Sequence, residues 1–284
     1  MSFETQKNEI IKICKKLFKE EGTKVIIGFA QSEVEGITTP LFMRTAEDAE
    51  KLKWDSQCTP NLAKYLLEKR GKVGIVAKTC DARAIVMYLV EQQIKRDELY
   101  IIGVECPGMK NNDATASCGC EACKMRIPPI YDVLVKYNAE ITLPDSEEAS
   151  NTVAIEDNLK KFQDEMKKCI LCYSCRQVCY GCYCKSCFVD MNVPNWLPGE
   201  ISEGAKMIFH LGRAMHLAGR CVECGACERV CPSGVNIRYL IKEITKFTKE
   251  LYAYEAGIDP EETPALAVFN PNDSEAAMSG SEVQ

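Results

Sequence analysis

Two runs of four cysteines form the strongest chemical pattern in this 284-residue chain. Both runs read C-x2-C-x2-C-x3-C, and their members are Cys169, Cys172, Cys175 and Cys179, then Cys221, Cys224, Cys227 and Cys231. Three thiolates at this spacing can reach three irons of one [4Fe–4S] cluster from a single short loop. Zinc also binds C-x2-C pairs, but it would leave cysteines of each run unused. The pattern therefore predicts iron–sulfur clusters.

The fourth cysteine of each run is expected to bind the cluster of the other run, as in two-cluster ferredoxins. A loop that already supplies three ligands is too short to reach the fourth iron. The prediction gives two ligand sets: cluster A uses Cys169, Cys172, Cys175 and Cys231, and cluster B uses Cys221, Cys224, Cys227 and Cys179.

Three further thiols follow the first run directly, at Cys182, Cys184 and Cys187. One interpretation is an additional cluster that takes its fourth ligand from elsewhere, with Cys58 or Cys118 as candidates. A second is a zinc ion that fixes this insert between the two runs. A third is that the thiols are structural or alternative ligands, and the sequence leaves all three open.

Charged side chains surround the two runs. His210 and His216 are six residues apart, on opposite faces of an expected helix, which favours structural roles over a shared metal. Cations near the runs either raise the reduction potential of a cluster or form a solvated face. They are Arg176, Lys185, Arg213, Arg220 and Arg229.

Residues 1–145 predict an α/β domain. Hydrophobic periodicity and turn signals predict a helix at 5–20, strands at 24–29 and 40–44, a helix at 59–70, a strand at 73–78, a helix at 82–94 capped by Asp81, and a strand at 99–105. The last strand, helix and strand form a right-handed βαβ unit with parallel strands. Cys14 on the first helix is expected to be a buried small hydrophobe.

Cysteines also follow both strands of the βαβ unit. Cys80 comes after the first strand and Cys106 after the second, and ligand sites in parallel sheets lie beyond these strand ends. The next loop adds Cys120 and Cys123, so a third [4Fe–4S] site is predicted here. A zinc site or isolated buried thiols are the alternatives, and Cys118 could replace one of the four.

The rest of the chain divides by composition. Residues 146–158 are acidic and aperiodic and predict a linker. Residues 159–253 predict a mainly helical domain with two clusters, built on helices at 159–168, 203–217 and 236–252. Residues 254–284 form a proline-containing tail with a disordered end, in which Leu266, Val268 and Phe269 could dock.

Bulk properties exclude several classes of protein. The net charge of −6 argues against a nucleic-acid partner. No apolar run approaches the roughly 18 residues of a membrane span. Eighteen cysteines without a secretory signal indicate metal binding in a reducing cytoplasm, as in an anaerobe.

The segments VGIVAKTCDARAIVMYL, LYIIGVECPGM and CEACKMRIPPIYDVL resemble the coenzyme F420 hydrogenase/formate dehydrogenase beta-subunit family over most of residues 20–140. KKCILCYSCRQVC and GRCVECGACERVCP are similar to the dicluster ferredoxin module fused to short members, and the flanking helices resemble ferredoxin domains of heterodisulfide reductases and of succinate dehydrogenase-type subunits. The resemblance also implies the cluster at Cys80, Cys106, Cys120 and Cys123.

The resemblance implies an electron-transfer subunit of a hydrogenase, a formate dehydrogenase or a heterodisulfide-reductase-like bifurcating complex, with other redox subunits as partners. Larger members bind FAD. The alternative hypothesis is therefore a flavin-bearing subunit that exchanges electrons with F420 or NAD(P). A zinc-stabilised scaffold without redox activity is a third hypothesis.

Overall fold

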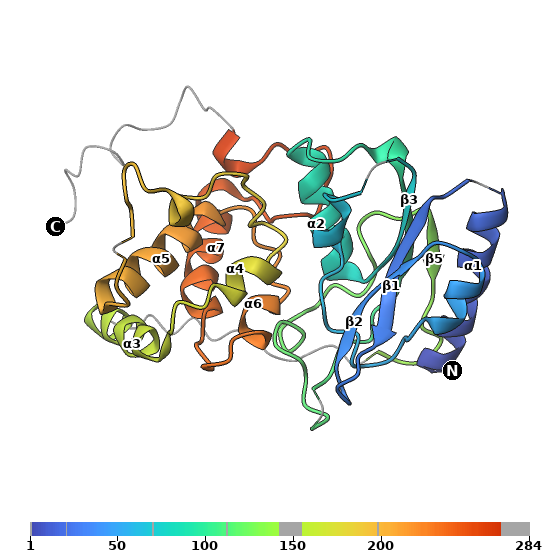
Figure 1. The fold of residues 1–284 in the computed structure, drawn as a ribbon, viewed down its shortest axis with the longest axis horizontal. Coiled ribbons are helices and arrows are strands. Elements are labelled where there is room, and N and C mark those ends of the chain that lie inside the picture. The colour runs from blue at the N-terminus through green and yellow to red at the C-terminus, as the bar shows by residue number, and fades with distance from the viewer. Residues whose placement is uncertain are drawn as a thin grey trace.

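The computed structural model describes residues 2–20, 22–69, 71–111, 113–141, 155–197 and 199–267. An α/β part and a helical part lie side by side (Figure 1). Most of the predicted linker, and the tail beyond residue 267, lie outside the described residues. None of the helices in the described ranges has the length and apolar character that crossing a bilayer requires.

The α/β part is built on one five-stranded sheet of order β2-β1-β3-β4-β5. The strands are β1 (Val25–Gln31), β2 (Thr38–Met43), β3 (Val73–Ala77), β4 (Leu99–Val104) and β5 (Val133–Val135). β2 runs antiparallel to β1, and the other neighbouring pairs are parallel. The predicted βαβ unit is confirmed as β3, α2 (Thr79–Val90) and β4. The three-residue β5 was not predicted, because it is too short to show periodicity.

Two helices cover the sheet. α1 (Phe3–Glu20) and α2 lie on opposite faces, and α2 separates the sheet from the helical part (Figure 1). All five residues of β3 are buried, as expected for a strand covered on both faces. Cys14 of α1 is fully buried, and this burial raises the pKa of its thiol to about 12. The expectation of a neutral hydrophobic Cys14 is therefore confirmed.

The predicted helix at 59–70 is wrong. Within the described residues of this stretch, the helical element is a short 3-10 helix, η2 (Ala63–Leu66). The backbone N–H of Leu62 donates to the Asp81 carboxylate at 2.6 Å instead of to a carbonyl of its own helix. Tertiary contacts thus override the local N-cap signal in this segment.

The predicted start of the next helix is also corrected. α2 begins at Thr79 with Lys78 as its N-cap, and Asp81 is the third helical residue. The Asp81 carboxylate accepts the Lys78 backbone N–H at 2.9 Å and pairs with the Lys78 ammonium at 2.9 Å. Lys78 and Asp81 are 1% and 0% exposed in their side chains. Asp81 therefore caps the helix from its first turn, which is how acidic residues commonly act there.

The helical part contains the three long helices that were predicted and two short ones that were not. Its elements are α3 (Ile155–Lys168), α4 (Ser174–Val178), η4 (Phe188–Asp190), α5 (Glu203–His216), α6 (Ala226–Arg229) and α7 (Arg238–Tyr252). α4 and α6 lie inside the two cysteine runs. The remaining 3-10 helices are η1 (Glu47–Lys51), η3 (Arg96–Glu98) and η5 (Ala265–Ala267).

The apolar core of the α/β part extends into the second half of the chain, and the helical part also has a core of its own. The cluster around the sheet includes Tyr180, Val222, Tyr254, Ala256 and Ala265 from the second half of the chain. The described part of the tail is held on α2, where Arg83 donates to the carbonyl of Ala256 at 2.8 Å. The part of the tail around Ala256 therefore docks within this chain. Val268 and Phe269, two of the three residues suggested for docking, lie outside the described residues.

Candidate metal centres

The two cysteine runs have the same local backbone. Leu171 and Glu223, each two residues after the first cysteine of its run, have φ of 51° and 55°. Tyr173 and Gly225, each four residues after it, have φ of 59° and 72° and act as N-caps of α4 and α6. Three of these four residues are not glycine, and positive φ is uncommon in such residues. The sequence repeat is therefore also a structural repeat.

Backbone N–H groups point at the cysteine sulfurs in both loops. The Leu171 N–H donates to Cys169 Sγ at 3.3 Å, and the Glu223 N–H donates to Cys221 Sγ at 3.4 Å. The Val235 N–H likewise donates to Cys231 Sγ at 3.4 Å. Such donors stabilise negative charge on sulfur. This observation fits thiolates that bind a cluster.

Four cysteines from both runs line one small pocket of the helical part. They are Cys169, Cys172, Cys175 and Cys231, the set predicted for cluster A. His210 of α5 lines the same pocket, with its Nε2 at 3.3 Å from Cys169 Sγ. Burial, and then the nearby Arg213 charge, lower the pKa of His210 to about 4, so the ring is neutral. His210 is thus a buried neighbour of the first group.

The second group combines Cys179 of the first run with Cys221, Cys224 and Cys227. Burial, and then the charges of Cys179, Cys224 and Cys227, raise the pKa of Cys221. Burial also raises the pKa of Cys227 to about 12. Buried thiols of this kind become stable thiolates only with a compensating positive charge such as iron. The ligand set is the one predicted for cluster B and stays a prediction.

Cys80, Cys106, Cys120 and Cys123 line a cavity of about 540 Å³ at the carboxyl edge of the sheet. Cys80 lies in the first turn of α2, after β3, and Cys106 follows β4. Cys118 does not line this cavity; its thiol donates to the Glu228 carboxylate at 2.6 Å. Cys224 of the second group also lines the cavity, so the two groups are neighbours.

Two glycines hold the third group against the second run. A Cβ on Gly225 would lie 2.0 Å from the carbonyl oxygen of Cys118, and a Cβ on Gly119 would lie 2.8 Å from the carbonyl carbon of Cys224. Both glycines have positive φ, of 72° and 93°. Arg229 adds hydrogen bonds to the carbonyls of Cys224 at 2.8 Å and Thr59 at 2.9 Å. The two loops therefore meet backbone to backbone.

The large cavity is strongly basic, a feature that the sequence reasoning missed. Its walls include Lys78, Arg83, Lys124, Arg126, Arg229, Arg238, Lys242 and Lys249, with Glu223 and Glu255 as acidic members. The buried hydroxyls of Thr79 and Ser117 line it and have no hydrogen-bond partner. A volume of about 540 Å³ is typical of small-molecule sites. No local sequence signal could have found it, because its cations come from both halves of the chain.

The three insert cysteines line a separate pocket of about 40 Å³. Cys182, Cys184 and Cys187 share this pocket with His216, which the sequence reasoning had treated as structural. Neither suggested fourth ligand lines it. Cys58 is fully buried in the core of the α/β part, and Cys118 contacts Glu228. The insert cysteines are therefore close together, and their role stays open.

Across the described ranges, no three Cys, His, Asp or Glu side chains converge closely enough to hold a single metal ion. A cubane cluster spreads its four thiolates over four irons, so its ligands lie further apart than those of one ion. Donor type, donor number and N–H···S contacts of the first two groups fit such a cluster, as does the donor set of the third. The assignments of individual ligands remain predictions.

The comparisons with known proteins bear on the family. No family model matches the chain. The F420-dependent formate dehydrogenase subunit beta of Methanocaldococcus jannaschii is 21% identical over 320 residues, covering 78% of this chain and 83% of that protein. The F420-dependent formate dehydrogenase 1 subunit beta of Methanococcus maripaludis is 23% identical over 331 residues, covering 80% and 84%. These similarities confirm the resemblance to the formate dehydrogenase beta-subunit family.

Proposed function

We propose that this chain is an iron–sulfur electron-transfer subunit of a multi-subunit oxidoreductase. It relays electrons one at a time through clusters A and B and a third cluster at Cys80, Cys106, Cys120 and Cys123. The two relatives are named as formate dehydrogenase beta subunits, which favours a formate dehydrogenase over a hydrogenase or a heterodisulfide-reductase-like complex. Its partners are then the catalytic and other redox subunits of that complex.

The observation that carries this proposal is the adjacency of three cysteine groups. Cys224 of the second group lines the cavity of the third. Cys179, a ligand of the second group in this proposal, comes from the loop that supplies the first. A series of neighbouring redox sites is what a relay requires, and two isolated zinc sites would not need it.

The ends of the relay differ in their exposure. Cys172 in the first group is exposed, and the neighbouring Ile170 is 54% exposed. None of the four cysteines of the third group is exposed, and all four line the cavity between the two parts of the chain. We therefore assign the surface around the first run as the point where a partner subunit exchanges electrons.

Anaerobic purification of the tagged full-length chain from its own cells tests this function. We expect it to copurify with an oxidoreductase subunit, and we expect the complex's substrate to produce the EPR signals of reduced [4Fe–4S] clusters. Zinc without acid-labile sulfide would contradict the proposal and favour the scaffold. Clusters that dithionite reduces but that no copurifying subunit can reduce would contradict the relay.

The basic cavity favours one further candidate function, the flavin-bearing subunit. A flavin dinucleotide carries phosphates that arginines and lysines bind well. The third cysteine group on the cavity wall could then pass single electrons to and from a two-electron carrier. Acid extraction followed by an absorbance spectrum decides this point: about one flavin per chain supports it, and a colourless extract contradicts it.

A further inference from the structure

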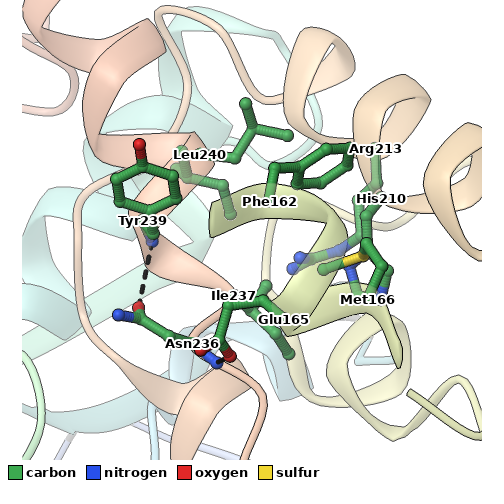
Figure 2. Close-up of a pocket in the computed structure, with 10 residues that line it drawn as sticks. Phe162, Glu165, Met166, His210, Arg213, Asn236, Ile237, Tyr239 and Leu240 are labelled. Carbon is green, nitrogen blue, oxygen red and sulfur yellow. Dashed lines mark hydrogen bonds between the residues drawn. The ribbon is translucent and has the colours of Figure 1, made fainter. Parts of the chain in front are cut away.

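Arg213 is a buried cation that contacts cysteines of the first run. It lies on α5 and is 4% exposed. Figure 2 shows it beside His210 of the same helix and next to Met166 of α3. The pocket drawn there measures about 10 Å³, which leaves room for about one water. Arg213 is thus held in a packed interior, where its guanidinium must find its partners within the protein.

The guanidinium is only partly satisfied by protein atoms. One terminal nitrogen donates to the Cys175 carbonyl at 3.2 Å, and the buried Nε has no hydrogen-bond partner. An unpaired N–H at this depth carries a substantial desolvation cost. Its presence points to an acceptor that belongs in the site but is not a protein atom.

Cysteines of both groups lie around the Arg213 guanidinium. Its side chain forms hydrogen bonds with the thiols of Cys179 and Cys182, donates to the Cys175 carbonyl, and lies close to the Cys227 thiol. Cys175 belongs to the first group, and Cys179 and Cys227 belong to the second. Arg213 therefore faces thiols of both proposed clusters.

Two other cations near the runs pair with carboxylates. Arg176 forms a bidentate pair with Asp190, and Arg220 forms one with Glu91. In both pairs a carboxylate neutralises the charge. Among the described residues, Arg213 contacts thiols and a carbonyl but no carboxylate. Its full positive charge is available to whatever the two cysteine groups bind.

We infer that Arg213 is a positioning residue shared by clusters A and B, donating N–H groups to sulfur of both and raising the reduction potential of both. This inference rests on the proposed function. Reduction adds negative charge to a cluster, and a fixed cation in a medium of low dielectric constant stabilises the reduced form.

The test compares variants of the full-length, anaerobically purified protein by iron and sulfide analysis and by EPR-monitored redox titration. We expect Arg213→Gln to keep both clusters and to shift both midpoint potentials to more negative values. Arg213→Lys keeps the charge but loses the planar fork, so its shifts should be smaller. Arg176→Gln is the matched control, because it removes a charge that Asp190 already neutralises, and should shift neither potential.

The outcomes separate this inference from the proposed function. A wild type without iron and sulfide would contradict the function itself. A loaded Arg213→Gln variant with unchanged potentials, or with only one changed, would overturn the shared role. If both Arg213 variants are purified without clusters, pulsed EPR of the wild-type protein labelled with ¹⁵N-arginine takes the place of the redox titration. A ¹⁵N coupling to both reduced clusters is expected, and its absence from either contradicts the inference.

Discussion

The two cysteine runs share spacing, left-handed backbone positions and N–H···S contacts, yet they have different surroundings. The first run borders solvent, with Cys172 exposed and its pKa lowered chiefly by a hydrogen bond with the Ser174 side chain. In the second run no cysteine is exposed: all four are half-buried, and burial raises the pKa of Cys224. The same loop thus occurs once with a cysteine open to solvent and once without.

The runs also contact the α/β part in different ways. After the first run, side chains make the contact: the Tyr88 hydroxyl donates to the Tyr180 carbonyl at 2.7 Å, and Lys64 Nζ reaches the Cys179 carbonyl at 3.4 Å. In the second run the main chain makes it, through Gly225 and Cys118. Side-chain contacts can adapt to substitution, whereas a backbone contact cannot. The second run therefore forms a rigid backbone contact between the helical part and the α/β part, and we call this contact the fixed joint.

The largest effect is expected from Cys224→Ser. Cys224 is a proposed cluster ligand at that joint, and metal binding to such a site contributes directly to folding free energy. We expect the loss of about four irons per chain, since one cubane cluster holds four, together with lower thermal stability. Iron analysis and calorimetry measure both. The control Cys14→Ser removes a thiol from the α1 core and should leave the iron content unchanged; equal iron loss in both variants would refute the assignment.

Gly225→Ala should be the most damaging change that touches no cysteine. The new Cβ would meet the Cys118 oxygen at 2.0 Å in a backbone region with φ of 72°. We expect a loss of about 3 kcal/mol or more in unfolding free energy, from strain plus a clash with backbone. Gly234→Ala isolates the strain, because its φ is 59° and no atom lies within 4 Å of the new Cβ. That control should lose only about 1–2 kcal/mol in unfolding free energy. An equal loss in the two variants would contradict a rigid contact at Gly225.

Glu91→Gln tests the side-chain contact near the first run. The Glu91 carboxylate at the end of α2 accepts hydrogen bonds from Arg220 and from the Tyr183 hydroxyl. The Arg220 and Glu91 side chains are 21% and 16% exposed. Loss of this partly buried pair should cost about 1–3 kcal/mol in denaturant unfolding. Both clusters should remain, because no proposed ligand is touched. Iron loss on the scale of Cys224→Ser would show that this contact is also a fixed joint.

Asp190→Asn should have the smallest effect. Asp190 pairs with Arg176 on the surface beside the first run, and its side chain is 56% exposed. Exposed pairs contribute roughly 0–1 kcal/mol, and salt weakens them further. Unfolding curves at low and high salt should nearly coincide with those of the wild type. A change comparable to that of Glu91→Gln would contradict the description of the first run as a solvent-exposed loop.

The sequence predicted local and repeated features well. Buried apolar runs identified β3 and β4, and the strand–helix–strand order placed Cys80 and Cys106 at one sheet edge. The prediction of a helix at 59–70 was wrong, because the Leu62 backbone N–H donates to the carboxylate of Asp81, a residue of α2. Contacts between distant segments leave no local pattern, and for this reason the prediction could not separate Arg213 from its neighbouring cations.

The cavity between the two parts illustrates the same limit. Arg126 precedes Arg229 by about a hundred residues, yet both line the space beside Cys80. Periodicity reports which face of an element is buried, but not which faces meet. The cysteine spacing was informative because one short loop contains most of the ligands of each proposed cluster. The role of the insert cysteines could not be deduced for the opposite reason, since their spacing matches no complete ligand set.

The central claim is that the two runs hold two cubane clusters and that the α/β part holds a third. Quantitative iron and acid-labile sulfide analysis of the anaerobically purified chain tests it most directly. With four irons per cluster, we expect about twelve irons and about twelve sulfides per chain, and about eight of each if the third group is empty. A fully loaded preparation with iron clearly below about eight, or with zinc and no sulfide, would contradict the account.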